Sequence, residues 1–278
     1  MRYELEPGRF GMRMVLRSMW TDELLAPFME NDVRELELNY AKGWKVQNLE
    51  FLNHLPNLLC LDLGHFTIED ISPIHVLHDL KALQIETYCK TKIDFSQFPK
   101  LEEVALEWRK GAESLFECSQ LRKVFVNRLK AESLSVFKKL TSLTSLRVYN
   151  SSIKSIGTIV IPTLTTLEIA NARKLASLKG IEGFPNLTRL VIEGCRAIRS
   201  IDPLSILKQL EVLTVANDGE IQSFKPLAGL KKLREVHFYE STNIEDGDLT
   251  PLKQVPGLVK VSFQERKHYN LKRKDFEL

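Results

Sequence analysis

The chain has 278 residues, of which 44% are hydrophobic and 27% are charged, a composition typical of a globular protein. No apolar run approaches the ~18 residues of a membrane helix, so the sequence predicts no membrane span. Residues 1–120 contain 13 Lys and Arg against 20 Asp and Glu, whereas residues 121–278 contain 26 against 16. Ends of opposite charge can steer a polarised protein partner, or bind an anion at the basic end.

The first predicted element is an N-terminal cap over residues 1–32. Its first twenty residues carry too many charges to form the apolar core of a secretory signal. Thr21 is a residue type that favours a helix N-cap, and the apolar residues that follow it have helical spacing: Leu24, Leu25, Phe28 and Met29. The pattern predicts an amphipathic helix that, together with residues 10–20, covers one end of the next domain.

From residue 33 to residue 263 the pattern L-x-x-L-x-L recurs eleven times, with Val, Ile or Phe allowed for Leu. The clearest units are LTTLEIANARKLASL (164–178), LTRLVIEGCRAIRSI (187–201) and LEVLTVANDGEIQSF (210–224). The units begin 20 to 25 residues apart, at Val33, Leu58, Leu80, Leu101, Leu121, Leu143, Leu164, Leu187, Leu210, Leu233 and Leu258.

These units resemble leucine-rich repeats, and their length near 22 residues is similar to that of internalin-like repeats. The segment IEDGDLTPL (244–252) resembles the return segment of cysteine-containing repeats. Each unit supplies one short strand, and stacked neighbours bury their leucines as one column. We therefore expect an α/β solenoid, a leucine-rich repeat horseshoe with about eleven parallel strands on its concave face. Short helices, 3₁₀ turns or loops form the convex face.

The ninth position of such a repeat is normally Asn or Cys, whose side chain bonds the backbone of the turn. Here it is Cys195, Ser151, Asp218 or Ser241 in four units. The other units depart from the pattern, with Ala41, Phe66, Tyr88, Arg109, Leu129, Ala172 and Arg266. The sequence thus predicts irregular loops in the first half. Residues 264–278 could cap the last strand or form a basic tail.

Motifs of catalysis are absent from the sequence, which contains no GxSxG, GxxxxGK[ST], GxGxxG or HExxH. The stretch STNIEDGDL (241–249) is rich in oxygen ligands, but its spacing does not match a calcium loop. We expect no enzyme activity, no cofactor and no metal site. Four scattered cysteines favour reduced thiols, and thus a cytoplasmic protein: Cys60, Cys89, Cys118 and Cys195.

The repeat also predicts which side chains line the concave face, at the third, fifth and seventh positions of each unit. An acidic strip runs along the first four strands and consists of Glu35, Glu37, Asp62, Glu86, Glu103 and Glu107. Residue types that dominate binding energies follow in later units: Phe125, Arg147, Tyr149, His237 and Tyr239. We interpret these eleven residues as candidates for partner binding.

The leading hypothesis is a non-catalytic, cytosolic protein-binding scaffold whose partner presents a basic surface. An adaptor, a regulatory subunit or an immunity protein that occupies a basic toxin would each fit. The alternative is binding of nucleic acid or an anionic surface through the basic C-terminal half, where charge gathers at Lys267, Lys272, Arg273 and Lys274. We regard nucleic acid as the less favoured partner, and the sequence leaves the oligomeric state open.

Overall fold

The computed structural model describes residues 2–46, 48–55 and 57–276 and contains two compact units. The N-terminal unit comprises residues 1–124 and the C-terminal unit residues 125–278. Strand β7 (Lys123–Asn127) contains the point of division.

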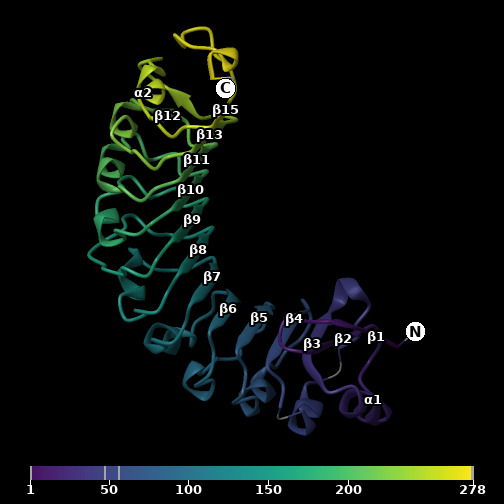
Figure 1. Ribbon diagram of the computed structural model, residues 1–278. Helices are drawn as coiled ribbons and strands as arrows, with labels where there is room; N and C mark the ends of the chain where they lie inside the picture. Colours follow the sequence, from purple (N-terminus) through teal and green to yellow (C-terminus); the bar gives the residue numbers. More distant parts are fainter. Residues whose placement is uncertain (1, 47, 56, 277–278) are drawn as a thin grey trace. The chain divides into compact units, whose positions relative to one another are not determined.

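In the N-terminal unit, strands β2 to β6 run parallel and pair in chain order, and β1 pairs antiparallel with β2 at the edge (Figure 1). The strands are β1 (Tyr3–Pro7), β2 (Met12–Leu16), β3 (Val33–Asn39), β4 (Cys60–Gly64), β5 (Ala82–Glu86) and β6 (Glu103–Glu107). The helical segments are the α-helix α1 (Leu25–Glu30) and the 3₁₀ turns Asp22–Leu24, Tyr40–Lys42, Glu50–His54, Ser72–Val76, Phe95–Gln97 and Glu113–Glu117.

In the C-terminal unit, strands β8 to β11, β13 and β15 form parallel pairs in chain order. The strands are β8 (Ser145–Tyr149), β9 (Thr166–Ala170), β10 (Arg189–Glu193), β11 (Val212–Ala216), β13 (Glu235–Tyr239) and β15 (Lys260–Phe263), with the short pair β12 (Glu220–Ile221) and β14 (Asn243–Ile244). The helical segments are α2 (Thr250–Lys253) and the 3₁₀ turns Leu134–Phe137, Ile181–Gly183, Asp202–Ile206, Lys225–Leu227 and Arg273–Phe276.

The predicted strands are confirmed: each of the eleven L-x-x-L-x-L segments contains a strand at the expected place. The leucines of successive strands share one core, as at Leu146, Leu167 and Leu190, which are 0% exposed. Mostly 3₁₀ turns return the chain between strands. Side chains at the third, fifth and seventh positions project from the opposite side of the sheet, which we call the open face of each unit.

The N-terminal cap differs from its prediction. A helix is present at Leu25–Glu30, but Thr21 makes no side-chain capping bond and Met29 is 61% exposed. The unexpected part is a β-hairpin, β1–β2, whose turn is closed by a 2.8 Å bond from Gly8 N to Gly11 O. Gly11 has a φ of +143°, a region that glycine adopts readily. Hairpin strand β2 extends the repeat sheet by pairing with β3.

After six strands, β7 to β11 and β13, the chain turns through the eighth position of the repeat, which adopts left-handed φ. In three repeats of the C-terminal unit this residue is asparagine, which tolerates that conformation: Asn150, Asn171 and Asn217, at φ of 52°, 56° and 56°. The Asn171 side-chain amide donates to Asn150 Oδ1 at 3.1 Å, so adjacent turns are also bonded to one another.

At two ninth positions where the sequence lacks Asn or Cys, arginine bonds the turn instead. Arg109 Nη2 donates to Thr87 O at 2.9 Å, and its Nη1 donates to Cys89 O at 3.2 Å. Arg266 Nη2 donates to Glu240 O and Thr242 O, both at 2.9 Å, which are the equivalent carbonyls one repeat earlier. The expected loss of order in the first half is therefore limited: residues 87–94 contain no helix or strand, yet Arg109 bonds two of their carbonyls.

The C-terminal segment packs against the last strand over the part that the structure describes, up to residue 276. Tyr269 is 3% exposed and Phe276 is 9% exposed, and both rings pack near Phe263 of β15 at centroid distances of 6.0 and 5.9 Å. Two of its basic residues also bond the chain: Arg266 through the carbonyls described above, and Lys272 through Arg266 O.

Candidate functional site

On the open face of the C-terminal unit, Glu168 of β9 is the centre of a charged and aromatic cluster. Tyr149 donates its hydroxyl to Glu168 Oε2 at 3.0 Å, while Arg147 Nε and Arg189 Nε lie 3.3 and 3.7 Å from the carboxylate oxygens. Burial, followed by this bond to Glu168, raises the pKa of Tyr149. Both arginine side chains are about half exposed, at 52% and 48%. The Glu168 cluster thus presents two guanidinium groups that share one carboxylate.

Phe125 completes one side of this cluster. Its ring meets that of Tyr149 edge to face, with centroids 5.0 Å apart and planes at 87°. Three of the predicted binding residues, Phe125, Arg147 and Tyr149, therefore lie together as the repeat register implied. Whether they bind a partner stays a prediction.

The other two predicted residues of the C-terminal unit lie apart from the cluster. His237 shares the register row of Arg147 but is four strands away, which at ~4.8 Å per strand is roughly 19 Å. Its Nε2 lies 3.0 Å from Glu235 Oε2 on the same strand. Tyr239 is 40% exposed at the end of β13.

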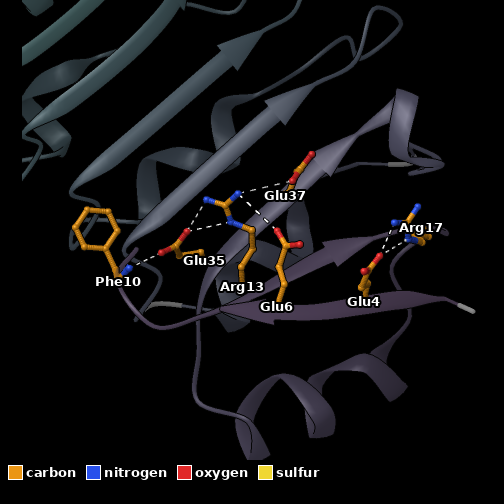
Figure 2. A network of polar contacts seen from close by, with 7 residues as sticks. All are labelled: Glu4, Glu6, Phe10, Arg13, Arg17, Glu35 and Glu37. Atoms are coloured by element: carbon orange, nitrogen blue, oxygen red, sulfur yellow. Dashed lines mark hydrogen bonds and ion pairs between the residues drawn. The ribbon is translucent and has the colours of Figure 1, made fainter. Parts of the chain in front are cut away.

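The acidic strip of the N-terminal unit is largely engaged within the chain. Arg13 of the hairpin places its Nη2 2.7 Å from Glu35 Oε2, and its Nη1 lies 3.9 Å from Glu37 (Figure 2). Glu35 is 0% exposed and also accepts a bond from Phe10 N, and Glu37 is 7% exposed. A fully buried carboxylate cannot contact a partner, so Glu35 leaves the predicted binding set.

The tip of the hairpin reaches along the same row of side chains to β6. The register aligns Glu35, Cys60, Ala82 and Glu103 across β3 to β6. Arg9 Nη2 donates to Glu103 Oε1 at 2.6 Å, and Lys123 Nζ lies 3.0 Å from the same oxygen. Burial opposes ionisation of Glu103, but these two cations hold its pKa below the ordinary value.

Two other acids of the strip, Asp62 and Glu86, have no Lys, Arg or His nitrogen within ion-pair distance among the described residues. Burial first, and the charge of Glu37 second, raise the pKa of Asp62 to about 6. Its Oδ1 is buried and has no hydrogen-bond partner among the described residues. Glu86 is exposed, whereas Glu107 is partly exposed at the end of β6.

Sequence reasoning missed a row of exposed aromatic rings, which we call the aromatic ridge: Tyr40, Phe66 and Tyr88, 52%, 44% and 59% exposed. Each ring follows the end of one of the adjacent strands β3, β4 and β5. A signal was present, because Phe66 and Tyr88 occupy ninth positions where the repeat expects a small polar residue.

Several other polar side chains have roles in the fold. His75 bonds Ser72 O and Asp94 N, and His78 bonds Gln97 O. In the stretch 241–249, Asp248 Oδ1 accepts from Thr250 N at 2.9 Å at the start of α2. Glu245 pairs with Arg199 at 2.7 Å. Among the described residues, no three His, Cys, Asp or Glu side chains are grouped to hold a metal ion.

Within residues 2–46, 48–55 and 57–276 there is no helix with the length and apolar character that crossing a membrane requires. No protein-family model matches the sequence, and no curated protein matches it.

Solved structures do resemble the chain. An internalin, InlF, from Listeria monocytogenes is 20% identical with a TM-score of 0.56, over 81% of this chain and 73% of that one. The functional domain of InlJ from the same organism, which includes a cysteine ladder, is 17% identical with a TM-score of 0.51. That match covers 86% of this chain and 61% of the InlJ chain. At such identities the likeness establishes the fold: the chain has the leucine-rich repeat fold of the internalins.

Proposed function

We propose that the chain is a non-catalytic protein-binding scaffold that uses the open faces of its repeats. The observation that carries this proposal is the Glu168 cluster, where Phe125, Tyr149 and two half-exposed arginines occupy adjacent strands. Aromatic and arginine side chains in such clusters dominate the energy of protein interfaces. A rigid parallel sheet holds them in fixed register, so little ordering is required when a partner binds.

The proposal also covers the charge of the partner and the location of the protein. The partner presents basic groups to the N-terminal unit, where Glu86 is exposed and Asp62 is partly exposed on the open face. All four cysteines are free thiols, which supports a reducing, cytoplasmic location. An adaptor, a regulatory subunit or an immunity protein would each bind a basic partner in this location.

The test is site-specific photo-cross-linking in the cells that produce the protein. A photoreactive residue replaces Arg147 on the open face or, as the matched control, Ile206, which is 56% exposed at the end of a 3₁₀ turn in the same unit. We expect protein adducts from position 147 and none from position 206. Equal adducts from both positions, or adducts with nucleic acid alone, would contradict the proposal.

A further inference from the structure

The aromatic ridge is the starting observation. Phe66 lies between the other two rings, with its centroid 5.0 Å from that of Tyr40 and 5.5 Å from that of Tyr88. The Phe66 and Tyr88 planes are stacked at 22°, so the two exposed rings form one apolar surface. Clusters of exposed apolar side chains are typical of interaction sites.

Carboxylates border the ridge on the open face. The seventh-position row across β3, β4 and β5 reads Asn39, Gly64 and Glu86. Gly64 has no side chain, and a Cβ placed there would lie 3.5 Å from the nearest atom, in Asn39, which is ordinary contact. The row is therefore low at Gly64, between the side chains of Asn39 and Glu86. Asp62, two residues earlier on the same strand, supplies a second carboxylate beside this gap.

The chain itself shows which ligand chemistry this face accepts. At the hairpin tip the Arg9 guanidinium lies 4.8 Å from the centre of the Phe10 ring. The same guanidinium bonds Glu103, while Phe10 N bonds Glu35. A cation that lies beside an aromatic ring is thus already paired with one carboxylate, Glu103, at the beginning of the strands. Glu86 ends β5, two residues before Tyr88, and Asp62 lies in the middle of β4, four residues before Phe66.

We propose that the aromatic ridge, with Asp62 and Glu86, binds a segment of a partner protein that carries Arg or Lys next to an aromatic or aliphatic residue. The apolar side chain covers the Phe66 edge, and the cation lies over Gly64 between the two carboxylates. Both carboxylates disfavour a polyanion, so nucleic acid does not fit this site. The inference rests on the proposed function and adds its second contact region and its ligand chemistry.

Selection from a display library of random 12-residue peptides tests the proposal, with the intact chain as bait. We expect enrichment of peptides that pair a basic residue with an aromatic or aliphatic one. The Phe66→Ser change is expected to weaken the selected peptides by tenfold or more, the loss typical of truncating an interface aromatic. Met29→Ser is the matched control, because Met29 is a 61% exposed apolar residue outside the ridge. Circular dichroism verifies that each variant is folded.

Charge exchange tests the second half of the proposal. Glu86→Arg is expected to weaken a selected peptide by about tenfold, and changing the basic residue of the peptide to Glu is expected to restore binding. No enrichment, enrichment of acidic sequences, or peptides that bind equally to the Phe66→Ser chain would overturn the inference. If selected peptides respond to Tyr149→Ala and not to Phe66→Ser, the scaffold function stands and this inference fails. If no peptide binds and position 147 yields no protein adduct, both fail.

Discussion

Arg13 Nη2 lies 2.7 Å from Glu35 Oε2 and joins the N-terminal hairpin to the first repeat strand (Figure 2). Glu35 is 0% exposed, and a buried carboxylate persists as a charge only beside a compensating cation and hydrogen-bond donors. The hairpin supplies both, through Arg13 and Phe10 N. It is therefore an integral part of the repeat sheet, and the acid next to it serves stability.

Removing this cation is expected to destabilise the N-terminal unit. Arg13→Ala leaves Glu35 buried with its backbone donor alone, and breaking a buried ion pair typically costs ~3 kcal/mol. Urea unfolding measures the change. Arg2→Ala is the control, because the Arg2–Glu23 pair has side chains 57% and 78% exposed, and such a pair contributes less than ~1 kcal/mol. Equal losses of unfolding free energy in both variants would show that the buried pair contributes no more to stability than the exposed one.

Arg109 is expected to be irreplaceable by lysine. Its planar guanidinium bonds two carbonyls of the preceding turn, Thr87 O and Cys89 O, and a lysine ammonium lacks that fork. Arg109→Lys should therefore speed amide hydrogen exchange in residues 87–94. Lys110→Ala, at the exposed neighbouring position, should leave the exchange unchanged. Arg266→Lys is expected to have the same effect at residues 240–244, and protection equal to wild type in both arginine variants would contradict this role.

The strands were predictable because the solenoid encodes them locally. Each L-x-x-L-x-L unit specifies its own strand, and neighbours repeat the same buried positions, so Leu146 and Leu167 could be assigned without knowing the fold. The same periodicity placed Phe125, Arg147 and Tyr149 on one face, and the structure brings their side chains together.

Repeat periodicity could not predict the hairpin, or the pairing of the acidic strip with cations from it. The segment ELEPGRFGMRMV (residues 4–15) belongs to no repeat unit, so periodicity does not apply to it, although a Gly8–Gly11 turn is a recognisable hairpin signal. The pairing of Arg9 with Glu103 joins residues 94 positions apart, which no local pattern reports. The sequence alone therefore assigns Glu35 and Glu103 to a basic partner, whereas the structure pairs them with arginines of the hairpin.

Cys89 is expected to be the first cysteine to react with an alkylating agent. Burial alone would raise the pKa of its thiol, but the Thr87 hydroxyl at 3.3 Å and the Arg109 guanidinium at 3.0 Å lower it overall. Burial raises the pKa of Cys60 and Cys195 to about 12 and that of Cys118 to about 11. Because the thiolate is the nucleophile, iodoacetamide should label Cys89 before the other three, as peptide mass spectrometry can follow. Uniform labelling of all four cysteines would contradict it.

Phe125→Ala and Tyr149→Ala are expected to speed dissociation of the protein cross-linked from position 147. Truncating an interface aromatic residue typically costs ~2 kcal/mol, and most such losses appear in the dissociation rate. Added salt should instead slow association, because rim charges act on the encounter. Surface plasmon resonance with the purified partner separates the two rates. Wild-type dissociation from both variants would exclude the Glu168 cluster from the interface.

Asp218 is expected to make the protein less stable as pH rises towards neutrality. This carboxyl is 0% exposed; its Oδ1 accepts from Cys195 N, and its Oδ2 is buried without a partner among the described residues. Burial raises the pKa of Asp218 from 3.8 to about 7. The folded chain therefore retains a proton between pH 4 and pH 7 that the unfolded chain releases.

The sign of the effect follows from that difference. Since the folded state binds more protons in this range, the free energy of unfolding falls with rising pH, by up to ~1.4 kcal/mol per pH unit. Asn in place of Asp keeps the acceptor for Cys195 N and cannot ionise, so Asp218→Asn should remove this slope while other groups titrate as before. Urea unfolding of both proteins at pH 5.0, 6.0 and 7.5 provides the comparison. Parallel curves for wild type and variant would show that Asp218 is not protonated in the folded chain.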